Sequence, residues 1–219
     1  MEVSSHALDQ YRVADVDFNV AVFTNLTPEH LDYHATLESY YQAKAKLFRM
    51  LPMESTAIAN GSDPNGTRIL TETSAPYLIF SNENGTSIHF SECQMDLSGI
   101  RGTVSAGQSI YNINSNLIGG FNCENILAAV SSAHALGINQ EAIENGIENC
   151  LSIPGRMESF QLASGGTAII DYAHTPDAYE KVLGTIKKLN SENGNIFVVF
   201  GAGGDRDSGK RPQMARIAE

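Results

Sequence analysis

Two segments near the end of the chain, each directly after a short apolar run, constrain the fold more than any other feature. Residues 171–178 (DYAHTPDA) follow the run 167–170, and residues 201–212 (GAGGDRDSGKRP) follow the run 196–200. Each run predicts a buried strand, and a helix can follow each segment. In an open α/β sheet, ligands bind at the carboxyl ends of strands. We therefore expect both segments to line one crevice, where glycines let backbone N–H groups approach a phosphate or carboxylate.

The composition is ordinary for a globular protein and narrows the range of partners. The 219 residues carry a formal net charge of −11, whereas a nucleic-acid or anionic membrane surface needs clustered Lys and Arg. Cys93, Cys123 and Cys150 form no CxxC pair, so we expect small buried side chains rather than a disulfide framework or structural zinc. No apolar run approaches the roughly 20 residues of a membrane span, and no signal peptide is evident. We therefore expect a cytoplasmic monomer that binds small molecules.

The pattern of apolar residues predicts an α/β domain over residues 1–153 and the start of a Rossmann-like domain over 154–219, with Pro154-Gly155-Arg156 at the boundary. Residues 87–114 alternate apolar and polar side chains, which indicates an insertion of antiparallel strands. The other elements predicted in the first domain are strands at 17–26, 56–60 and 75–80, a loop at 28–34, and helices at 36–51, 122–135 and 140–151. In the second they are strands at 167–171 and 195–200 and helices at 176–190 and from 211.

Several N-terminal residues suit a metal ion. Glu2 follows what reads as a strand end, where a carboxylate can hold Mg²⁺. Ser4 can contact a phosphate or sugar oxygen, or can simply cap a helix. The segment TNLTPEHLDYH also begins at a strand end, and its hard oxygen donors make one histidine, His30, beside Mg²⁺ more plausible than a zinc pair. We expect His34 to be a capping or core histidine.

Two helical positions admit both a functional and a structural explanation. If Lys44 points inward, burial favours its neutral amine, which can add CO₂ to give a metal-binding carbamate. If it points outward, it is a solvated surface group. Asn122 and Asn125 open another predicted helix as ordinary capping residues, although an amide can also pair with the edge of a nucleotide base.

The candidate residues of the second domain suit an anion or a ribose. Arg156 lies at the expected hinge, where it can reach a phosphate across the cleft or remain an exposed charge. Asp171 and His174 follow a predicted strand end, where an Asp commonly binds ribose hydroxyls. Arg206, in the glycine-rich segment, can bind a carboxylate or phosphate or belong to a solvated basic turn.

The motifs together resemble the Mur ligases. MEVSSHAL, VFTNLTPEHLDYH, QAKAKLF, GFNCENILAA, PGRME, DYAHTPDA and GAGGDRDSGKRP occur in this order and cover essentially the whole chain. The resemblance implies a central ATPase-like domain with a mostly parallel sheet, followed by a Rossmann-like C-terminal domain. It also implies an ATP-dependent amide ligase of peptidoglycan synthesis. Such an enzyme joins a third amino acid, meso-diaminopimelate or L-lysine, to UDP-MurNAc-L-Ala-D-Glu through an acyl phosphate.

The same resemblance implies roles for individual residues. Those near Mg²⁺ are Glu2, His30 and a carbamylated Lys44. Those that contact the UDP-MurNAc-dipeptide are Ser4, Gln10 and Arg12. Those that contact ATP are Asn125 at adenine, Arg156 at phosphate and Asp171 at ribose. Arg206 clamps the incoming amino acid, and His174 is a further candidate for substrate binding.

The chain also departs from the family pattern. It contains no GxxGKT-type phosphate loop and no Asp-Asn-Pro-Arg-type segment, and Ala202 replaces a Cys that is common at that position. We therefore expect a fragment, truncated at both ends, that has no ligase activity alone. Two alternatives stay open. One is a ligase that adds glutamate to folate, and the other is a non-catalytic module that binds a nucleotide or a metal.

Overall fold

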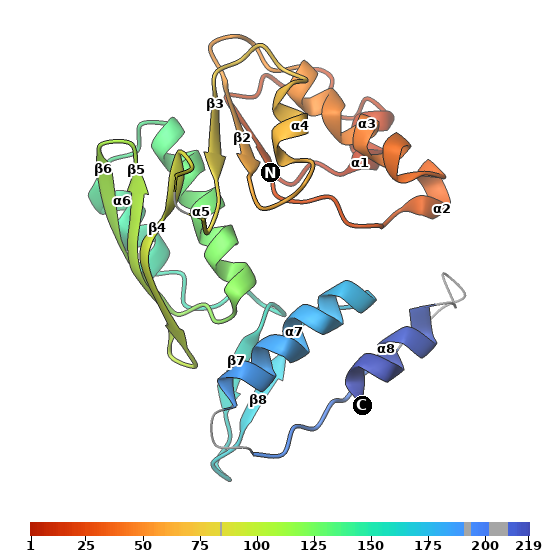
Figure 1. Cartoon of the computed structure of the whole chain (residues 1–219), viewed down its shortest axis with the longest axis vertical. Helices are drawn as coiled ribbons and strands as arrows, with labels where there is room; N and C mark the ends of the chain where they lie inside the picture. Colours follow the sequence, from red (N-terminus) through yellow and green to blue (C-terminus); the bar gives the residue numbers. More distant parts are fainter. Residues whose placement is uncertain (84, 191–193, 202–209) are drawn as a thin grey trace.

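A six-stranded sheet forms the centre of the first domain (Figure 1). The computed structural model describes residues 1–83, 85–190, 194–201 and 210–219. β1 (Val20–Phe23), β2 (Thr56–Asn60) and β3 (Tyr77–Phe80) are parallel, and β3 pairs in parallel with the start of β4. β4 (Ile88–Asp96), β5 (Gly99–Ala106) and β6 (Ser109–Ser115) pair antiparallel. The expected α/β fold with a mostly parallel sheet and an antiparallel insertion is confirmed.

The alternating side chains of β2 divide the hydrophobic core between the two faces of the sheet. Ala57 and Ala59 pack with α3 (Leu37–Arg49) and α4 (Gly66–Leu70) on one face. Ile58 packs with α5 (Gly120–Ala135) on the other face. A strand covered by helices on both sides has apolar side chains on both faces, which explains the consecutive apolar residues 57–59 of β2. Figure 1 shows α5 running alongside the strands that it covers.

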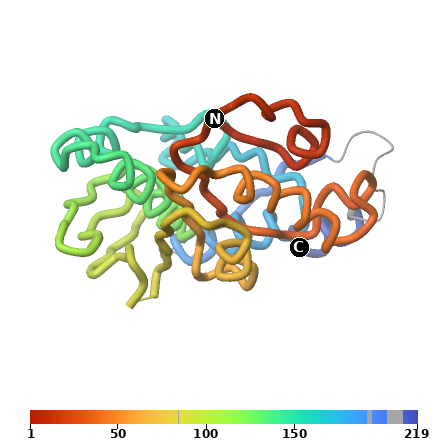
Figure 2. The backbone as a smooth tube through the Cα atoms, turned by 90° about the horizontal axis from the view of Figure 1, so that it is seen from above, coloured from red at the N-terminus to blue at the C-terminus, as the bar shows by residue number. Residues whose placement is uncertain are grey.

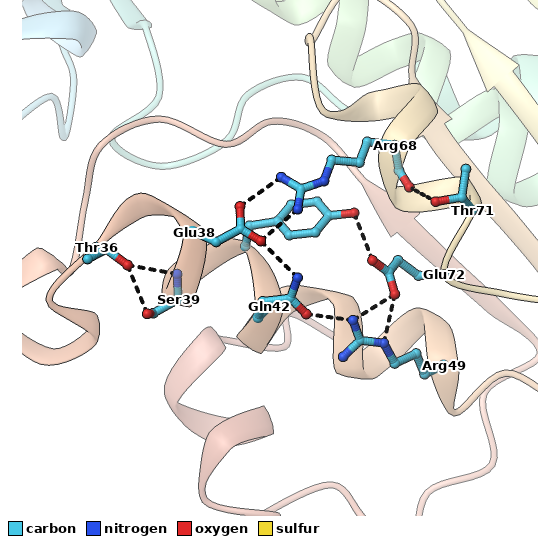
Figure 3. Close-up of polar contacts among 9 residues, drawn as sticks. Thr36, Glu38, Ser39, Gln42, Arg49, Arg68, Thr71 and Glu72 are labelled. Atoms are coloured by element: carbon cyan, nitrogen blue, oxygen red, sulfur yellow. Dashed lines mark hydrogen bonds and ion pairs between the residues drawn. The ribbon is translucent and has the colours of Figure 1, made fainter.

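α3 begins and ends within two residues of its predicted bounds, and its exposed side is tied to α4 (Figure 3). Thr36 is the N-cap, and its Oγ1 accepts a hydrogen bond from the Ser39 N–H at 3.0 Å. Arg68 of α4 donates to both carboxylate oxygens of Glu38, at 2.9 and 2.6 Å. Its guanidinium also lies 3.7 Å from the centre of the Tyr41 ring. This network fixes the two helices against each other at the surface.

Two short helices precede α3 and pack against it. α1 (Ser5–Asp9) is capped by Ser4, whose Oγ accepts from the Ala7 N–H at 3.1 Å, as the structural explanation of that serine predicts. α2 (Leu31–His34) is a single helical turn within the segment predicted as a loop. In the view from above, the N-terminal segment lies beside α3 at one side of the molecule (Figure 2).

α5 and α6 (Gln140–Glu148) cover the antiparallel half of the sheet, and Gly137 turns the chain between them with φ of 67°. The N-cap of α5 is Gly119 with φ of 102°, so the expectation that Asn122 and Asn125 cap this helix is wrong. Both asparagines lie within its first two turns instead. α6 is fixed to β6 by Glu144 Oε1, which accepts from the Asn112 N–H at 2.7 Å.

The cysteines do not all lie in the core. Cys123 of α5 is buried, as expected. Cys93 on β4 is exposed and Cys150 is half-buried, so the expectation of three buried thiols is wrong for these two. Residues 91–96 of β4, which include Cys93, are exposed throughout.

The C-terminal part has its own small sheet and core. β7 (Glu158–Gln161) and β8 (Thr167–Ile170) pair antiparallel, and β7 was not predicted. α7 (Pro176–Leu189) has Thr175 as its N-cap and a proline in its first turn, a favoured start for a helix. It packs against α8 (Lys210–Ala218) through a cluster of Tyr179, Leu183 and Met214. Within the described residues, every helix is too short or too polar to span a bilayer.

The prediction of a strand at 195–200 is wrong. Residues 194–200 have no regular secondary structure and pair with no strand among the described residues. A strand needs a hydrogen-bonded neighbour, and β8 pairs only with β7 here. The apolar side chains of this stretch are largely exposed, with Phe197 at 86% and Val199 at 98%, although the Phe200 ring contacts Tyr179. The expected crevice between two adjacent strands is therefore not formed by these residues.

Candidate functional site

A cavity of about 480 Å³ lies where the parallel strands of the first domain end. Asn25 follows β1, Asn60 ends β2 and Asn82 follows β3, and all three line the cavity. The first turns of α5 form a second wall. α7 of the C-terminal part forms a third, with Lys181 and Lys188 in its lining. This cavity is not the crevice predicted after residues 167–170 and 196–200, because it lies at the ends of β1, β2 and β3, between the first sheet and α7.

Asn125 is the one predicted nucleotide-binding residue that lines this cavity. Its Nδ2 donates to Asn122 Oδ1 at 2.9 Å, and Asn122 Nδ2 donates to the backbone oxygen of Ile118 at 2.8 Å. Asn122 is buried whereas Asn125 is exposed. The buried amide therefore holds the exposed one in place, and the exposed one retains an acceptor oxygen and a second N–H.

A second polar pair joins β2 to α5 in the wall of the cavity. Asn60 Nδ2 donates to Glu124 Oε2 at 2.9 Å, and Asn60 Oδ1 accepts from the Ser62 N–H at 2.9 Å. Sequence reasoning missed both Asn60 and Glu124. The available signal was the position of Asn60 at the last residue of a predicted strand.

Lys44 is half-buried, and nearby carboxylates act on its charge. Burial lowers the pKa of its ammonium, and Glu29, Glu2 and Asp63 oppose this by favouring the charged form. The Nζ lies 5.0 Å from the centre of the Tyr40 ring. Of the two explanations of Lys44, the structure supports the inward-facing one. It also adds Glu29 and Asp63, which the sequence analysis did not single out.

Asp63 holds its place through backbone hydrogen bonds. Its Oδ2 accepts from the Leu26 N–H at 2.8 Å, and its Oδ1 accepts from the Asn65 N–H at 2.7 Å. Asp63 follows the end of β2, so the rule that pointed to Glu2 would have found it too. The bond to Leu26 joins the loop after β1 to the loop after β2.

The imidazoles of this region form a cluster against Tyr40. The centre of the His30 ring lies 5.0 Å from that of His6 and 5.8 Å from that of Tyr40. Burial raises the pKa of Tyr40 to about 12, so the phenol stays protonated. His34 is buried, and its Nε2 lies 2.9 Å from Ser5 Oγ, which confirms it as a core histidine. His30 and Lys44 therefore both lie beside the ring of Tyr40.

The segment after β8 is bound to the turn that carries Arg156. Asp171 Oδ2 accepts from the Met157 N–H at 2.8 Å, and its Oδ1 accepts from the Ala173 N–H at 2.7 Å. The guanidinium of Arg156 lies 5.6 Å from the centre of the Tyr172 ring. Two of the predicted ATP-binding residues thus belong to one unit of structure. A carboxylate has more than two acceptor positions, so Asp171 can still accept from a ribose.

His174 connects the two domains. Its Nε2 lies 3.6 Å from Glu29 Oε1, and its Nδ1 lies 3.0 Å from the backbone oxygen of Tyr172. Because Glu29 also acts on the charge of Lys44, the DYAHTPDA segment reaches one of the carboxylates near that lysine.

The other predicted residues stand apart from these groups or outside the description. Ser4 caps the start of α1, Gln10 and Arg12 follow its end, and all three side chains are exposed. Arg206 lies outside the described residues. Among the described residues, no three His, Cys, Asp or Glu side chains come together as a ready-made metal site. The set of Glu2, His30 and Lys44 as metal ligands stays a prediction.

The Mur ligase middle domain matches residues 1–133, and the Mur ligase glutamate ligase domain matches residues 155–219. The chain belongs to the Mur ligase family. It is 44% identical over 224 residues to the UDP-N-acetylmuramoyl-L-alanyl-D-glutamate–2,6-diaminopimelate ligase of Geobacter metallireducens. That alignment covers 100% of this chain and 43% of the relative.

Two solved structures share the fold. A UDP-N-acetylmuramoyl-L-alanyl-D-glutamate–2,6-diaminopimelate ligase matches with a TM-score of 0.75 at 35% identity, over 99% of this chain and 45% of that one. The FPGS-AMPPCP-folate complex matches with a TM-score of 0.72 at 18% identity, over 91% of this chain and 49% of that one. At that identity the second likeness concerns the fold alone. The chain spans less than half the length of these Mur ligase relatives, and a domain boundary at residue 154 stays a prediction.

Proposed function

We propose that this chain is part of an ATP-dependent amide ligase that joins meso-diaminopimelate to the γ-carboxylate of UDP-MurNAc-L-Ala-D-Glu. A carboxylate oxygen attacks the γ-phosphorus of ATP, and ADP leaves. The amine of the incoming amino acid then attacks the acyl phosphate, and phosphate leaves. The 44% identity to a ligase named for these two substrates, over the whole chain, carries the proposal. The same name favours diaminopimelate over L-lysine.

The cavity between the two domains supports binding of ATP there. Asn125 would pair with adenine, and Lys181 and Lys188 supply positive charge to the same cavity. Arg156 would contact a phosphate and Asp171 the ribose. Because the Asp171 carboxylate accepts from the N–H of Met157, the residue after Arg156, a movement of the hinge would bring Arg156 and Asp171 to the nucleotide as a pair.

The donors around Lys44 fit Mg²⁺ in their chemistry. Mg²⁺ prefers oxygen ligands and is often held by one or two carboxylates together with substrate phosphates and water. Glu2 and His30 would hold it, with Glu29 and Asp63 as neighbouring carboxylates. A carbamate on Lys44 would turn a half-buried cation into an anion that suits a second ion. When bound, Mg²⁺ would offset the negative charge of the phosphates.

The exposed N-terminal residues suit the large anionic substrate. Ser4, Gln10 and Arg12 would contact the UDP-MurNAc-dipeptide, and Arg206 would bind the carboxylate of the incoming amino acid. We place this activity in the cytoplasm, where ATP and UDP-linked precursors are available, and propose that the enzyme acts as a monomer.

The experiment that tests this function is product formation by the longer protein that contains these residues. With ATP, Mg²⁺, UDP-MurNAc-L-Ala-D-Glu and meso-diaminopimelate, we expect equal amounts of ADP, phosphate and UDP-MurNAc-tripeptide, identified by mass. Asn125→Ala is expected to raise the KM for ATP about tenfold, the effect of about 1 kcal/mol or slightly more for a lost hydrogen bond. Asn145→Ala, at an exposed asparagine of α6, is the matched control and should leave KM unchanged.

Two results would refute the proposal. One is addition of glutamate to a folate in place of tripeptide formation, which the 18% identity to the folate-bound structure does not favour. The other is ATP hydrolysis with no dependence on either substrate. The expectation that the 219-residue chain alone is inactive stays a prediction, and the same assay on that chain tests it.

A further inference from the structure

Two cysteines from different elements meet at the surface of the first domain. Cys93 lies on β4 and Cys123 in the first turn of α5, 30 residues apart in sequence, and their Sγ atoms are 3.8 Å apart. Cys93 is exposed, whereas Cys123 is 6% exposed. An oxidant can therefore reach the Cys93 sulfur from solvent, whereas the Cys123 sulfur is buried next to it.

The structure of β4 explains why Cys93 faces α5. Ile88 and Phe90 point into the core beside α5, so regular alternation would send residue 93 to the opposite face. A register shift between Phe90 and Glu92 interrupts the alternation. Such irregularities re-aim side chains. The shift places Cys93 on the same side as the buried core residues, where it meets Cys123.

The backbone around the pair is held in place on both sides. Cys93 is opposite Gly102 of β5, where an added Cβ would lie 2.0 Å from the backbone oxygen of Glu92. Only glycine therefore allows the two strands to approach this closely. α5 packs on β4 and β5 through buried Ile126 and Leu127. Closing from 3.8 Å to the roughly 2.05 Å of a disulfide thus requires side-chain rotation and a small shift of the two elements.

We propose that Cys93 and Cys123 form a reversible disulfide, a redox modification site that joins β4 to α5. The oxidant is a peroxide. The Cys93 sulfur attacks the peroxide oxygen, which gives a sulfenic acid and one water. The Cys123 sulfur then attacks the sulfenic sulfur, loses its proton and releases a second water. The two thiols lose two electrons and two protons, and hydrogen peroxide is reduced to two waters.

The environment of each thiol supports this order of events. Burial, followed by the proximity of Cys93, raises the pKa of the Cys123 thiol to about 12, so this sulfur is almost entirely protonated at neutral pH. The nucleophile toward peroxide is a thiolate, and the buried Cys123 forms it less readily than an ordinary thiol does. The exposed Cys93 therefore reacts first, and Cys123 acts as the resolving thiol. This inference does not depend on the proposed ligase function.

The test is oxidation of the 219-residue chain by hydrogen peroxide, followed by mass spectrometry without reduction. Arg101 separates Cys93 from Cys123, and Glu124 separates Cys123 from Cys150, so a trypsin and glutamate-specific digest puts each cysteine on its own peptide. We expect a linked pair of Cys93 and Cys123 peptides, a loss of about 2 Da that dithiothreitol reverses, and a free Cys150.

Variants make the outcome decisive. Cys93→Ser and Cys123→Ala should abolish the loss of about 2 Da, whereas Cys150→Ser should retain it. Circular dichroism of each variant confirms that it folds. The proposal is overturned if Cys93 is driven to sulfinic acid while Cys123 stays a free thiol. It is equally overturned if the linked peptides contain Cys150, or if no link forms in a folded chain.

Discussion

His174 Nε2 lies 3.6 Å from Glu29 Oε1, so the DYAHTPDA segment touches the loop that carries His30. Both side chains are more than a third exposed, and ion pairs of this kind contribute about 0–1 kcal/mol. His174→Ala should therefore change the free energy of unfolding by less than about 1 kcal/mol, as measured with urea. A loss several times larger would mean that this contact holds the two domains together.

Lys44 gives the chain a pH dependence of stability with a defined sign. Its pKa in the folded chain is lowered by burial from a usual 10.5, so the folded state binds this proton less tightly than the unfolded state. Folding is penalised at pH values below the lowered pKa, and the penalty fades as the pH rises toward 10.5. Lys44→Met removes the charge, so the variant should be more stable than the parent chain at neutral pH.

The control for that experiment is Lys187→Met, at an exposed lysine of α7. In urea unfolding between pH 6 and 10.5, the gain in the free energy of unfolding from Lys44→Met should shrink as the pH rises. Lys187→Met should change the free energy of unfolding little at any pH. If the gain in stability from Lys44→Met is the same at every pH, changed packing or contacts, rather than proton binding, cause it.

The pKa of Glu38 is held at about 2 by hydrogen bonds from Arg68 and then Gln42 (Figure 3). Since the folded pKa lies below the usual 4.5, this carboxylate stabilises the fold above pH 4.5, and the contribution is lost as the pH falls toward 2. Arg68→Met should raise the pKa toward 4.5. The measurement is an NMR titration of the Glu38 side chain. An unchanged midpoint in the variant would show that Arg68 does not set it.

Ile58 lies at the centre of β2 with no exposed surface, whereas Ile110 on β6 is 57% exposed. Truncating a buried isoleucine to alanine removes about 2–5 kcal/mol of stability, because the transfer energy is lost and a cavity is left. Ile58→Ala should show that loss in urea unfolding, and Ile110→Ala should stay within about 0.5 kcal/mol. Equal effects of the same substitution at both positions would contradict the assigned core.

Elements defined by local periodicity and capping could be predicted closely. β2 has its predicted bounds, and α3 begins and ends within two residues of its own, because the apolar residues 57–59 and the capping residue Thr36 are both visible in the sequence. Residues 194–200 show the limit of such reasoning. Their composition suits a strand, but a strand forms only where a neighbour offers hydrogen bonds, and sequence does not reveal that.

In the candidate site too, residues that local motifs indicate could be predicted, and residues brought together by the fold could not. The rule that ligands bind at strand ends pointed to residues 24–34, and Thr24 and Asn25 line the cavity, but it also pointed to residues 171–178, which do not. Motif resemblance pointed to Lys44 and Asn125. Asp63 was missed although it follows a predicted strand end, and Glu124 was missed because its contact with Asn60 joins residues 64 positions apart. Nothing in a local pattern brings such residues together, and only the packing of α3, α5 and the sheet does so.

The central claim is an amide ligation through an acyl phosphate, and oxygen transfer tests it most directly. UDP-MurNAc-L-Ala-D-Glu labelled with ¹⁸O in the γ-carboxylate would be given to the longer protein with ATP, Mg²⁺ and meso-diaminopimelate. We predict that each phosphate released carries one oxygen from that carboxylate and that ADP is the nucleotide product. Unlabelled phosphate formed alongside tripeptide, or release of AMP and pyrophosphate, would contradict the account.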